Sequence, residues 1–461
     1  MVFSSLEFLF LFLPLSLALI CAAPRRLRIA SIFFVSLIFY AWGGAAYLPL
    51  MLAVIAVNYA LGLLIGRAKK RKRLWLAVAV IFDLSVLAFF KYADFALENL
   101  PFLGLAPLGL ALPIGISFYI FQILSYVIDV YRGEVAPQKD PLIFGSYVTL
   151  FPQLIAGPIV KYRDVENQLK ESKRPPLFMI ASGVRTFVCG LSKKVLLANV
   201  AGELWQGIAS LSGEDRTAVI SWLGLIFFAL QIYFDFSGYS DMAIGLGKML
   251  GFRFLENFNY PYVADSITDF WRRWHISLSG WFREYLYIPL GGNRCGRGRV
   301  YFNLLAVLIA TGIWHGAGWN FLIWGLYYFF LLALEKAFLG SLIKRSPTPI
   351  PVAYTLFFVL VGWLIFAFDS TEQGMSYLLG MLGVSGGLAI SADIYEILRN
   401  LVFLLIAAIA CTPIPRRLFY RFYERSRAAD ALSLALCALG FALCVIYLVN
   451  SSYNPFLYFR F

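Results

Sequence analysis

The sequence is poor in charge and in histidine. Only 14% of its 461 residues are charged and two are histidines, His275 and His315, whereas 61% are hydrophobic. Soluble globular domains carry roughly 25% charged residues. This composition excludes an ordinary soluble enzyme and indicates a protein body embedded in a lipid bilayer.

Metal-binding and nucleotide-binding motifs are also absent from the sequence. The six cysteines form no CxxC pair and show no spacing typical of metal ligands. The two histidines could bind a metal together with Asp235 or Asp241, but neither an HxxxH nor an HxxE spacing occurs. No glycine-rich phosphate loop ending in Lys-Ser or Lys-Thr is present. We therefore expect no metal, no bound cofactor and no nucleotide hydrolysis within this chain.

Long apolar runs recur along the whole chain. A membrane helix needs about 20 mostly apolar residues, and a backbone inside lipid must satisfy its own hydrogen bonds. The runs are continuous, which predicts helices, and they lie near residues 5–23, 29–45, 47–66, 74–90, 113–131, 142–159, 178–208, 217–248, 301–318, 319–339, 351–369, 397–415 and 429–450. We expect an all-α polytopic integral membrane protein with about 11–13 membrane helices in one domain over residues 1–461.

The basic residues are confined to short loops between these runs. The net charge is +13, and Lys and Arg cluster at 25–28, 67–73 and 416–427. This distribution is typical of cytoplasmic loops of membrane proteins. Because no soluble basic domain exists to carry a nucleic-acid interface, we expect no nucleic-acid partner.

Three segments interrupt the apolar pattern. Residues 266–290 mix aromatic residues with arginines, which predicts an amphipathic interfacial helix or the lining of a polar cavity. Residues 311–320 place a histidine among glycines at the end of an apolar run. Residues 142–159 contain Pro152, Gly157 and Pro158, so we expect a re-entrant helix there rather than a plain crossing.

The two histidines are the candidate catalytic residues. A neutral imidazole can take a proton from a hydroxyl near neutral pH, as a general base does. Gly312, Gly316 and Gly318 have no side chains, so the main chain around His315 is left uncovered, which suits the approach of a substrate. The structural alternatives are a core His315 bonded to a helix carbonyl and a His275 that only packs between Trp274 and Ser277.

The carboxylates of Asp235 and Asp241 lie in an apolar stretch and need partners. The candidate partners are the basic residues Arg272, Arg273 and Lys248, which would fasten the 266–290 segment to the helix bundle. We favour this structural polar network over a catalytic role. A serine triad with Ser237 or Ser277 is disfavoured because neither serine sits in a GxSxG turn.

Seven segments, in order along the chain, carry a resemblance to a known family. They are MVFSSLEFLFLFLP at the start, LPIGISFYIFQILSYVIDVYRG at 112–133, FPQLIAGPIVKYRD at 151–164, YFDFSGYSDMAIGLGKMLGFRFLENFNYPY at 233–262, SITDFWRRWHISLSGWFREYLYIPLGGNR at 266–294, GIWHGAGWNFLIWG at 312–325 and NPFLYFRF at the end. The chain resembles the membrane-bound O-acyltransferase family, and in particular its bacterial branch that acetylates alginate and other polysaccharides.

The resemblance implies helices around a central tunnel, with His315 at the family's buried catalytic position and His275 at its second position. It implies a cytoplasmic thioester donor, acetyl-CoA or another acyl thioester, an extracytoplasmic polysaccharide acceptor and a separate SGNH-type partner protein. It also implies residence in the bacterial inner (plasma) membrane. In this chemistry His315 is the base, and Trp271, Trp314 and Asn320 are candidate substrate-binding residues.

Other functions stay open at this point. The same machinery would serve O-acetylation of peptidoglycan or D-alanylation of teichoic acid. A proton-coupled transporter or flippase would use the two histidines as a proton relay, although the sequence has no recognisable inverted repeat.

Overall fold

The structure is a computed structural model that describes residues 2–423, 428–451 and 453–457. Every regular element within these residues is a helix, as expected for an all-α membrane protein. Parts of two segments singled out in the sequence lie outside the described residues, namely 424–427 of the basic cluster and 458–461 of the closing motif.

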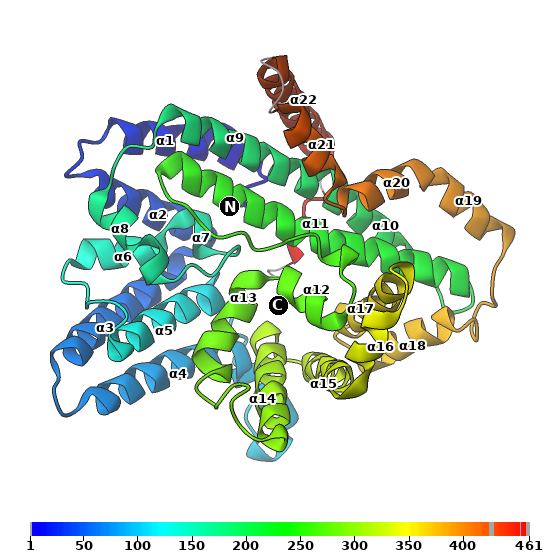
Figure 1. Cartoon of the computed structure of the whole chain (residues 1–461), viewed down its shortest axis with the longest axis horizontal. Helices are drawn as coiled ribbons and strands as arrows, with labels where there is room; N and C mark the ends of the chain where they lie inside the picture. The colour runs from blue at the N-terminus through cyan, green and yellow to red at the C-terminus, as the bar shows by residue number, and fades with distance from the viewer. Residues whose placement is uncertain (1, 424–427, 452, 458–461) are drawn as a thin grey trace. The chain divides into compact units, whose positions relative to one another are not determined.

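The chain forms two compact units (Figure 1). Unit 1 comprises Met1–Phe187 and Tyr239–Glu256, and unit 2 comprises Val188–Gly238 and Asn257–Phe461. Two of the three boundaries fall inside helices, in α9 (Leu177–Ser192) and in α11 (Ala218–Leu250), and the third, between residues 256 and 257, falls in the segment that follows α11. The expectation of one domain over the whole chain therefore stays a prediction.

Unit 1 is built around the buried helix α5 (Ile116–Arg132), which packs against its neighbours α3 and α4. Its helices, in order, are α1 (Leu13–Ala22), α2 (Arg28–Gly44), α3 (Leu48–Arg67), α4 (Lys72–Asn99), α5, α6 (Pro141–Thr149), α7 (Phe151–Leu154), α8 (Tyr162–Glu171) and the first part of α9. The predicted re-entrant segment 142–159 contains two short helices, α6 and α7, separated at Leu150. The side chain of Asp140 caps α6 by accepting a hydrogen bond from the Leu142 amide.

Unit 2 contains the end of α9, the helix α10 (Asn199–Ala209), the first two thirds of α11 and all helices after it. These later helices are α12 (Ile267–Arg273), α13 (Ile276–Phe282), α14 (Arg297–His315), α15 (Trp319–Leu334), α16 (Gly340–Arg345), α17 (Pro349–Ala367), α18 (Thr371–Met381), α19 (Ser391–Arg399), α20 (Leu401–Ala410), α21 (Ile414–Tyr423) and α22 (Ala428–Asn450). Several helices continue as short π-helical stretches, including Lys193–Ala198 after α9 and Arg283–Tyr287 after α13. The segment 266–290 is thus a chain of short helical pieces instead of one amphipathic helix.

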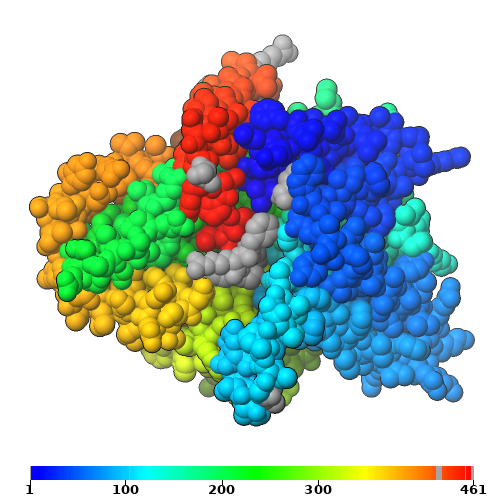
Figure 2. Space-filling view, turned by 180° about the vertical axis from the view of Figure 1, so that it is seen from behind, coloured from blue at the N-terminus to red at the C-terminus, as the bar shows by residue number. Residues whose placement is uncertain are grey.

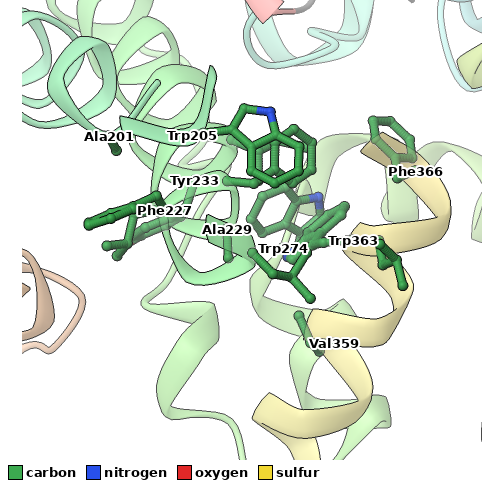
Figure 3. Packing of buried hydrophobic residues seen from close by; sticks show 14 of the residues in the cluster. Ala201, Trp205, Phe227, Ala229, Tyr233, Trp274, Val359, Trp363 and Phe366 are labelled. Atoms are coloured by element: carbon green, nitrogen blue, oxygen red, sulfur yellow. The ribbon is translucent and has the colours of Figure 1, made fainter. Parts of the chain in front are cut away.

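Aromatic side chains dominate the core of unit 2. Figure 3 shows the rings of Trp274 and Trp363 lying against each other, with centroids 4.8 Å apart, close to Tyr233 and Phe366. Each such ring buries a large apolar area and prefers tilted or edge-to-face contacts, which fix relative positions more closely than aliphatic packing does. The α12–α13 region is therefore held on a rigid aromatic base.

Six helical stretches of the described chain are long and apolar enough to cross a membrane. They are Arg28–Arg67, Lys72–Asn99, Ala218–Leu250, Trp319–Arg345, Pro349–Ala367 and Ala428–Asn450. The bent pair Leu401–Ala410 and Ile414–Arg421, with 66° between its halves, would be a seventh. This is fewer than the expected 11–13, because several apolar runs are divided into shorter helices.

Candidate active site

His275 occupies the junction between α12 and α13. Ser266 caps α12 through its side chain, which accepts a hydrogen bond from the Asp269 amide at 3.1 Å. The chain then turns, and His275 adopts a left-handed backbone conformation with φ of 44°, unusual for a residue with a side chain. Such strain is kept only where the surroundings fix it, and it is concentrated at functional sites.

Asn257 fixes the orientation of the His275 ring. Its side-chain oxygen accepts hydrogen bonds from the Ser277 amide at 3.1 Å and from the Ser277 hydroxyl at 2.9 Å. Because an amide N–H only donates, this atom of Asn257 is an acceptor. His275 Nδ1, 3.1 Å from the same oxygen, is therefore the protonated nitrogen, and its Nε2 carries the lone pair.

Glu335, at the end of α15, anchors the start of α12. Its carboxylate accepts hydrogen bonds from the amides of Ile267 at 2.7 Å and Thr268 at 2.9 Å, and from the Thr268 hydroxyl at 2.6 Å. A carboxylate at a helix N-terminus also interacts favourably with the helix dipole. Glu335 was not predicted from the sequence, because its only signal there is a charge near the end of an apolar run.

His315 is the last residue of α14, and a three-residue turn leads into α15. The glycines around it serve packing. A Cβ on Gly316 would lie 2.0 Å from the Phe321 ring, and one on Gly312 would lie 2.4 Å from the Phe321 carbonyl oxygen. Gly312 and Gly316 thus allow α14 and α15 to approach each other closely, and the expectation that the glycines suit the approach of a substrate stays a prediction.

Trp314 connects the two histidines. Its ring centroid lies 6.1 Å from that of His275 and 5.1 Å from that of His315. Both imidazoles are buried, with 1% of His275 and 7% of His315 exposed. His275 lies outside the six candidate spans. Its burial, and secondarily the proximity of His315, hold its pKa well below the ordinary value, so its ring is neutral at physiological pH.

A small cavity lies beside His315. Its walls are mostly aromatic, and the lining residues are Ile232, Asp235, Phe236, Trp274, His315, Trp324, Trp363, Phe366 and Leu457. The cavity thus places a buried imidazole against a mostly aromatic wall.

Trp324 is the second residue missed in the sequence. Its ring centroid lies 5.3 Å from that of His315, and only 1% of the residue is exposed. Its indole N–H has no hydrogen-bond acceptor within the described chain. A buried donor without an acceptor is costly, and beside a candidate base it is available to a ligand. The signal was its position one helical turn after Asn320 in α15.

The predicted substrate-binding residues take different places. Asn320 is buried, and neither polar atom of its side chain has a hydrogen-bond partner among the described residues. Trp271 packs edge-on against Trp324 with centroids 5.4 Å apart and does not line the cavity. Trp314 also lies outside the lining, between the imidazoles. Their roles in binding stay predictions.

The predicted polar network is wrong in the partner of Asp235. Asp235 pairs with Lys194 at 2.8 Å instead of Arg272, Arg273 or Lys248. Arg273 pairs with Asp269 at 2.6 Å, one turn away in α12, and Arg272 is exposed. Asp241 belongs to unit 1 and is half-buried. The physical reason is local. Arg273 pairs with Asp269 within α12, and Glu335 holds the start of α12 through its hydrogen bonds.

No group of three or more histidine, cysteine, aspartate or glutamate side chains suited to a metal occurs among the described residues. The carboxylate of Asp235 is already bound by Lys194 and by the Leu457 amide.

Comparison with known proteins places this site in a family. Residues 138–372 match the model of the membrane-bound O-acyltransferase family. The chain is 44% identical to a probable alginate O-acetylase of Azotobacter vinelandii over 382 residues, covering 81% of this chain and 76% of that protein. It is 39% identical to a probable alginate O-acetylase of Pseudomonas putida over the full length of both.

A more distant relative acts on another polymer. The peptidoglycan O-acetyltransferase of Helicobacter pylori is 37% identical, with 76% of this chain and 73% of that protein covered. The matched region contains both histidines, Trp314 and Trp324. The chain belongs to the membrane-bound O-acyltransferase family and is a multi-pass membrane O-acyltransferase.

Proposed function

We propose that this protein transfers an acetyl group from a cytoplasmic thioester towards an alginate-like polysaccharide outside the cell, with His315 as the general base. The observation that carries the proposal is the position of His315: it is buried on the wall of an aromatic cavity, beside a second buried histidine. The similarity over the whole chain to a probable alginate O-acetylase supports the substrate class.

In the proposed step, His315 accepts the proton of an acceptor hydroxyl as its oxygen attacks the thioester carbonyl. A new C–O bond forms, the C–S bond breaks, and the thiolate leaving group takes up the proton from His315. General-base assistance of this kind contributes about 10²–10⁴-fold to the rate. The mostly aromatic wall is proposed to limit the access of water, which would otherwise hydrolyse the thioester.

His275 is proposed to orient the acceptor instead of polarising the carbonyl. Its Nδ1–H is engaged by Asn257, so the neutral ring offers a lone pair at Nε2 and no second donor. Donors for the developing oxyanion have to come from elsewhere. The indole N–H of Trp324 and the side chain of Asn320, both buried and lacking protein partners among the described residues, are suited to this role.

The donor, partner and location complete the proposal. Acetyl-CoA or another acyl thioester supplies the acetyl group, and an extracytoplasmic SGNH-type protein completes delivery to the polymer. The protein resides in the bacterial inner membrane. Support comes from the relatives named as polysaccharide O-acetylases and from the apolar helices, which require a bilayer.

The test is acetylation by the purified protein in lipid nanodiscs, with radiolabelled acetyl-CoA and an alginate oligosaccharide, with and without the partner. We expect His315→Ala to abolish transfer and His315→Gln, which keeps the volume of the ring better, to do the same. Arg273→Lys is the matched control, because it changes a charged side chain of α12 outside the cavity. Full transfer by a stably folded His315→Ala protein would overturn the assignment.

The same assay separates the alternatives. Transfer to peptidoglycan fragments but not to alginate would assign the peptidoglycan polymer, and use of a D-alanyl carrier protein would assign D-alanylation. Movement of acetyl-CoA or glycan across the membrane without any bond formation would favour a transporter. Each of these outcomes would overturn the proposal in its present form.

A further inference from the structure

A buried ion pair holds the end of the described chain inside unit 2. Lys194 and Asp235 are 2.8 Å apart, and each side chain is only 4% exposed. The pair also binds main-chain atoms near the C-terminus. Lys194 Nζ donates a hydrogen bond to the carbonyl of Pro455, and Oδ2 of Asp235 accepts one from the amide of Leu457 at 2.8 Å.

These extra hydrogen bonds matter because of the burial. Removing two charges from water is unfavourable, and their attraction repays it only where further hydrogen bonds satisfy the remaining donors and acceptors. Here the backbone of residues 455–457 provides them. The buried ion pair depends on hydrogen bonds from residues 455–457, the tail, and the tail is held in place by the same hydrogen bonds. We therefore expect the ion pair and the tail to be ordered together.

Two further hydrogen bonds hold the residues just before this point. The side chain of Asn199 in α10 bonds to Asn454 at 3.3 Å, and Gln231 in α11 bonds to the hydroxyl of Tyr453 at 3.3 Å. Gly202 makes room for this approach: a Cβ there would lie 2.4 Å from Gln231 and 2.7 Å from the Tyr453 hydroxyl. Residues 453–457 are therefore held by side chains of both α10 and α11. In Figure 2 the red part of the chain, which includes α22, lies beside green helices of unit 2.

The ion pair Lys194–Asp235 and its hydrogen bonds to residues 455–457, called the clamp below, lie at the candidate active site. Asp235 and Leu457 both line the cavity that contains His315. We propose that Lys194 and Asp235 are positioning residues that hold residues 455–457 in place as one wall of the acyl-transfer cavity. The charged pair does no chemistry itself; it keeps the cavity closed to water and shaped for the substrate. This inference rests on the proposed function for its effect on activity.

The test removes both charges together. The double variant Lys194→Met/Asp235→Leu keeps apolar volume and leaves no buried charge unpaired. In nanodiscs, we expect hydrogen exchange at the Leu457 amide to become faster, whereas exchange in α12 and α14 stays unchanged. Acetyl transfer should fall on the order of tenfold to a hundredfold through kcat, as expected for a misplaced cavity wall. Thioester hydrolysis in the absence of acceptor should rise.

A second variant covers the case in which the double variant fails to fold. Gly202→Ala leaves the ion pair intact and pushes against Tyr453, so it should release the tail and reproduce the lower transfer and higher hydrolysis. The matched control is Gly207→Ala, also in α10, where a Cβ meets nothing within 4 Å. Unchanged exchange at Leu457 in the folded variants, or full transfer with a released tail, would overturn the inference.

These outcomes are distinct from failure of the proposed function. If the wild-type protein transfers no acetyl group, the proposed function fails, while the exchange measurement still tests the clamp. If the wild type is active, His315→Ala is inactive and the released-tail variants are fully active, the function stands and the clamp has no role in it.

Discussion

The side-chain oxygen of Asn257 accepts a hydrogen bond from Nδ1 of His275 across 3.1 Å, and the same oxygen is bound twice by Ser277. One acceptor thereby sets both the ring orientation and the tautomer of His275. The segment around Asn257 is itself fixed, because the Ile276 amide donates to the Asn257 carbonyl at 2.9 Å. An orienting partner of this kind is a common requirement of histidines that act in catalysis.

Replacing Asn257 should impair the reaction without removing an imidazole. In Asn257→Ala, His275 loses its acceptor and Ser277 loses two hydrogen bonds, so we expect kcat to fall about 10–100-fold, as for comparable orienting partners. Asn257→Asp keeps the acceptor but adds a negative charge, which raises the pKa of His275. Acetyl transfer measured against pH should then show its acidic limb displaced to higher pH in Asn257→Asp. If both variants had the same pH profile and the same rate as the wild type, this role of Asn257 would be contradicted.

Burial of the neutral His275 makes stability depend on pH. The pKa of His275 is held well below its ordinary value in the folded protein, whereas it is about 6.5 in the unfolded chain. Below about pH 6.5 the unfolded state binds a proton that the folded state does not, so stability falls as the pH decreases, by up to about 1.4 kcal/mol per pH unit. Thermal unfolding in nanodiscs between pH 7.5 and about pH 5 measures this slope. His275→Gln, which cannot titrate, should have a smaller slope; equal slopes would refute the prediction.

The sequence predicted the helical class and singled out both histidines as candidate catalytic residues, for identifiable reasons. Apolar runs longer than a soluble core helix leave few alternatives to membrane helices. His315 is conspicuous at the end of an apolar run, because ionisable groups there are rare, and His275 lies in the arginine-rich segment 266–290 that interrupts the apolar pattern. These are local signals, visible without knowing what packs against them.

The residues that support the histidines carried no such signal. Glu335 lies 68 positions from the Ile267 amide that it accepts from, and Lys194 lies 261 positions from Pro455. The expected partners of Asp235 were the arginines of α12, but Arg273 satisfies itself with Asp269 four residues away. The choice among several available charges depends on which helices pack together, and a single sequence does not contain that information in a readable form.

Trp324 is expected to contribute to catalysis through its N–H. Trp324→Phe keeps an aromatic ring against His315 but removes the donor. If the indole stabilises the developing oxyanion, kcat should fall about 100-fold or more with little change in KM, since the interaction is made mainly in the transition state. Trp363→Phe is the matched control in the cavity wall, because its indole N–H is already bound to the Tyr262 hydroxyl at 3.1 Å. Equal rates for Trp324→Phe and the wild type would exclude the role.

A buried carboxylate in unit 1 gives a test that is independent of the active site. Asp83 in α4 is fully buried within the span Lys72–Asn99, and Asn58 in α3 donates a hydrogen bond to it at 2.6 Å. Its other oxygen has no partner among the described residues. In Asn58→Leu the carboxylate loses this donor, so unfolding should become easier by about 1–3 kcal/mol, the cost of a buried polar group left unsatisfied. The double variant Asn58→Leu/Asp83→Leu removes both polar groups and should recover most of that loss.

The unfolding midpoints of the wild type, Asn58→Leu and the double variant, together with their acetyl transfer, show whether the pair Asn58–Asp83 serves stability or the reaction. Thermal unfolding in lipid should rank Asn58→Leu lowest, with the double variant near the wild type, if only the unpaired polar group is destabilising. A double variant as unstable as the single one would contradict this account. If instead the double variant is stable but transfers no acetyl group, Asp83 serves the reaction, as ionisable groups inside membranes often do.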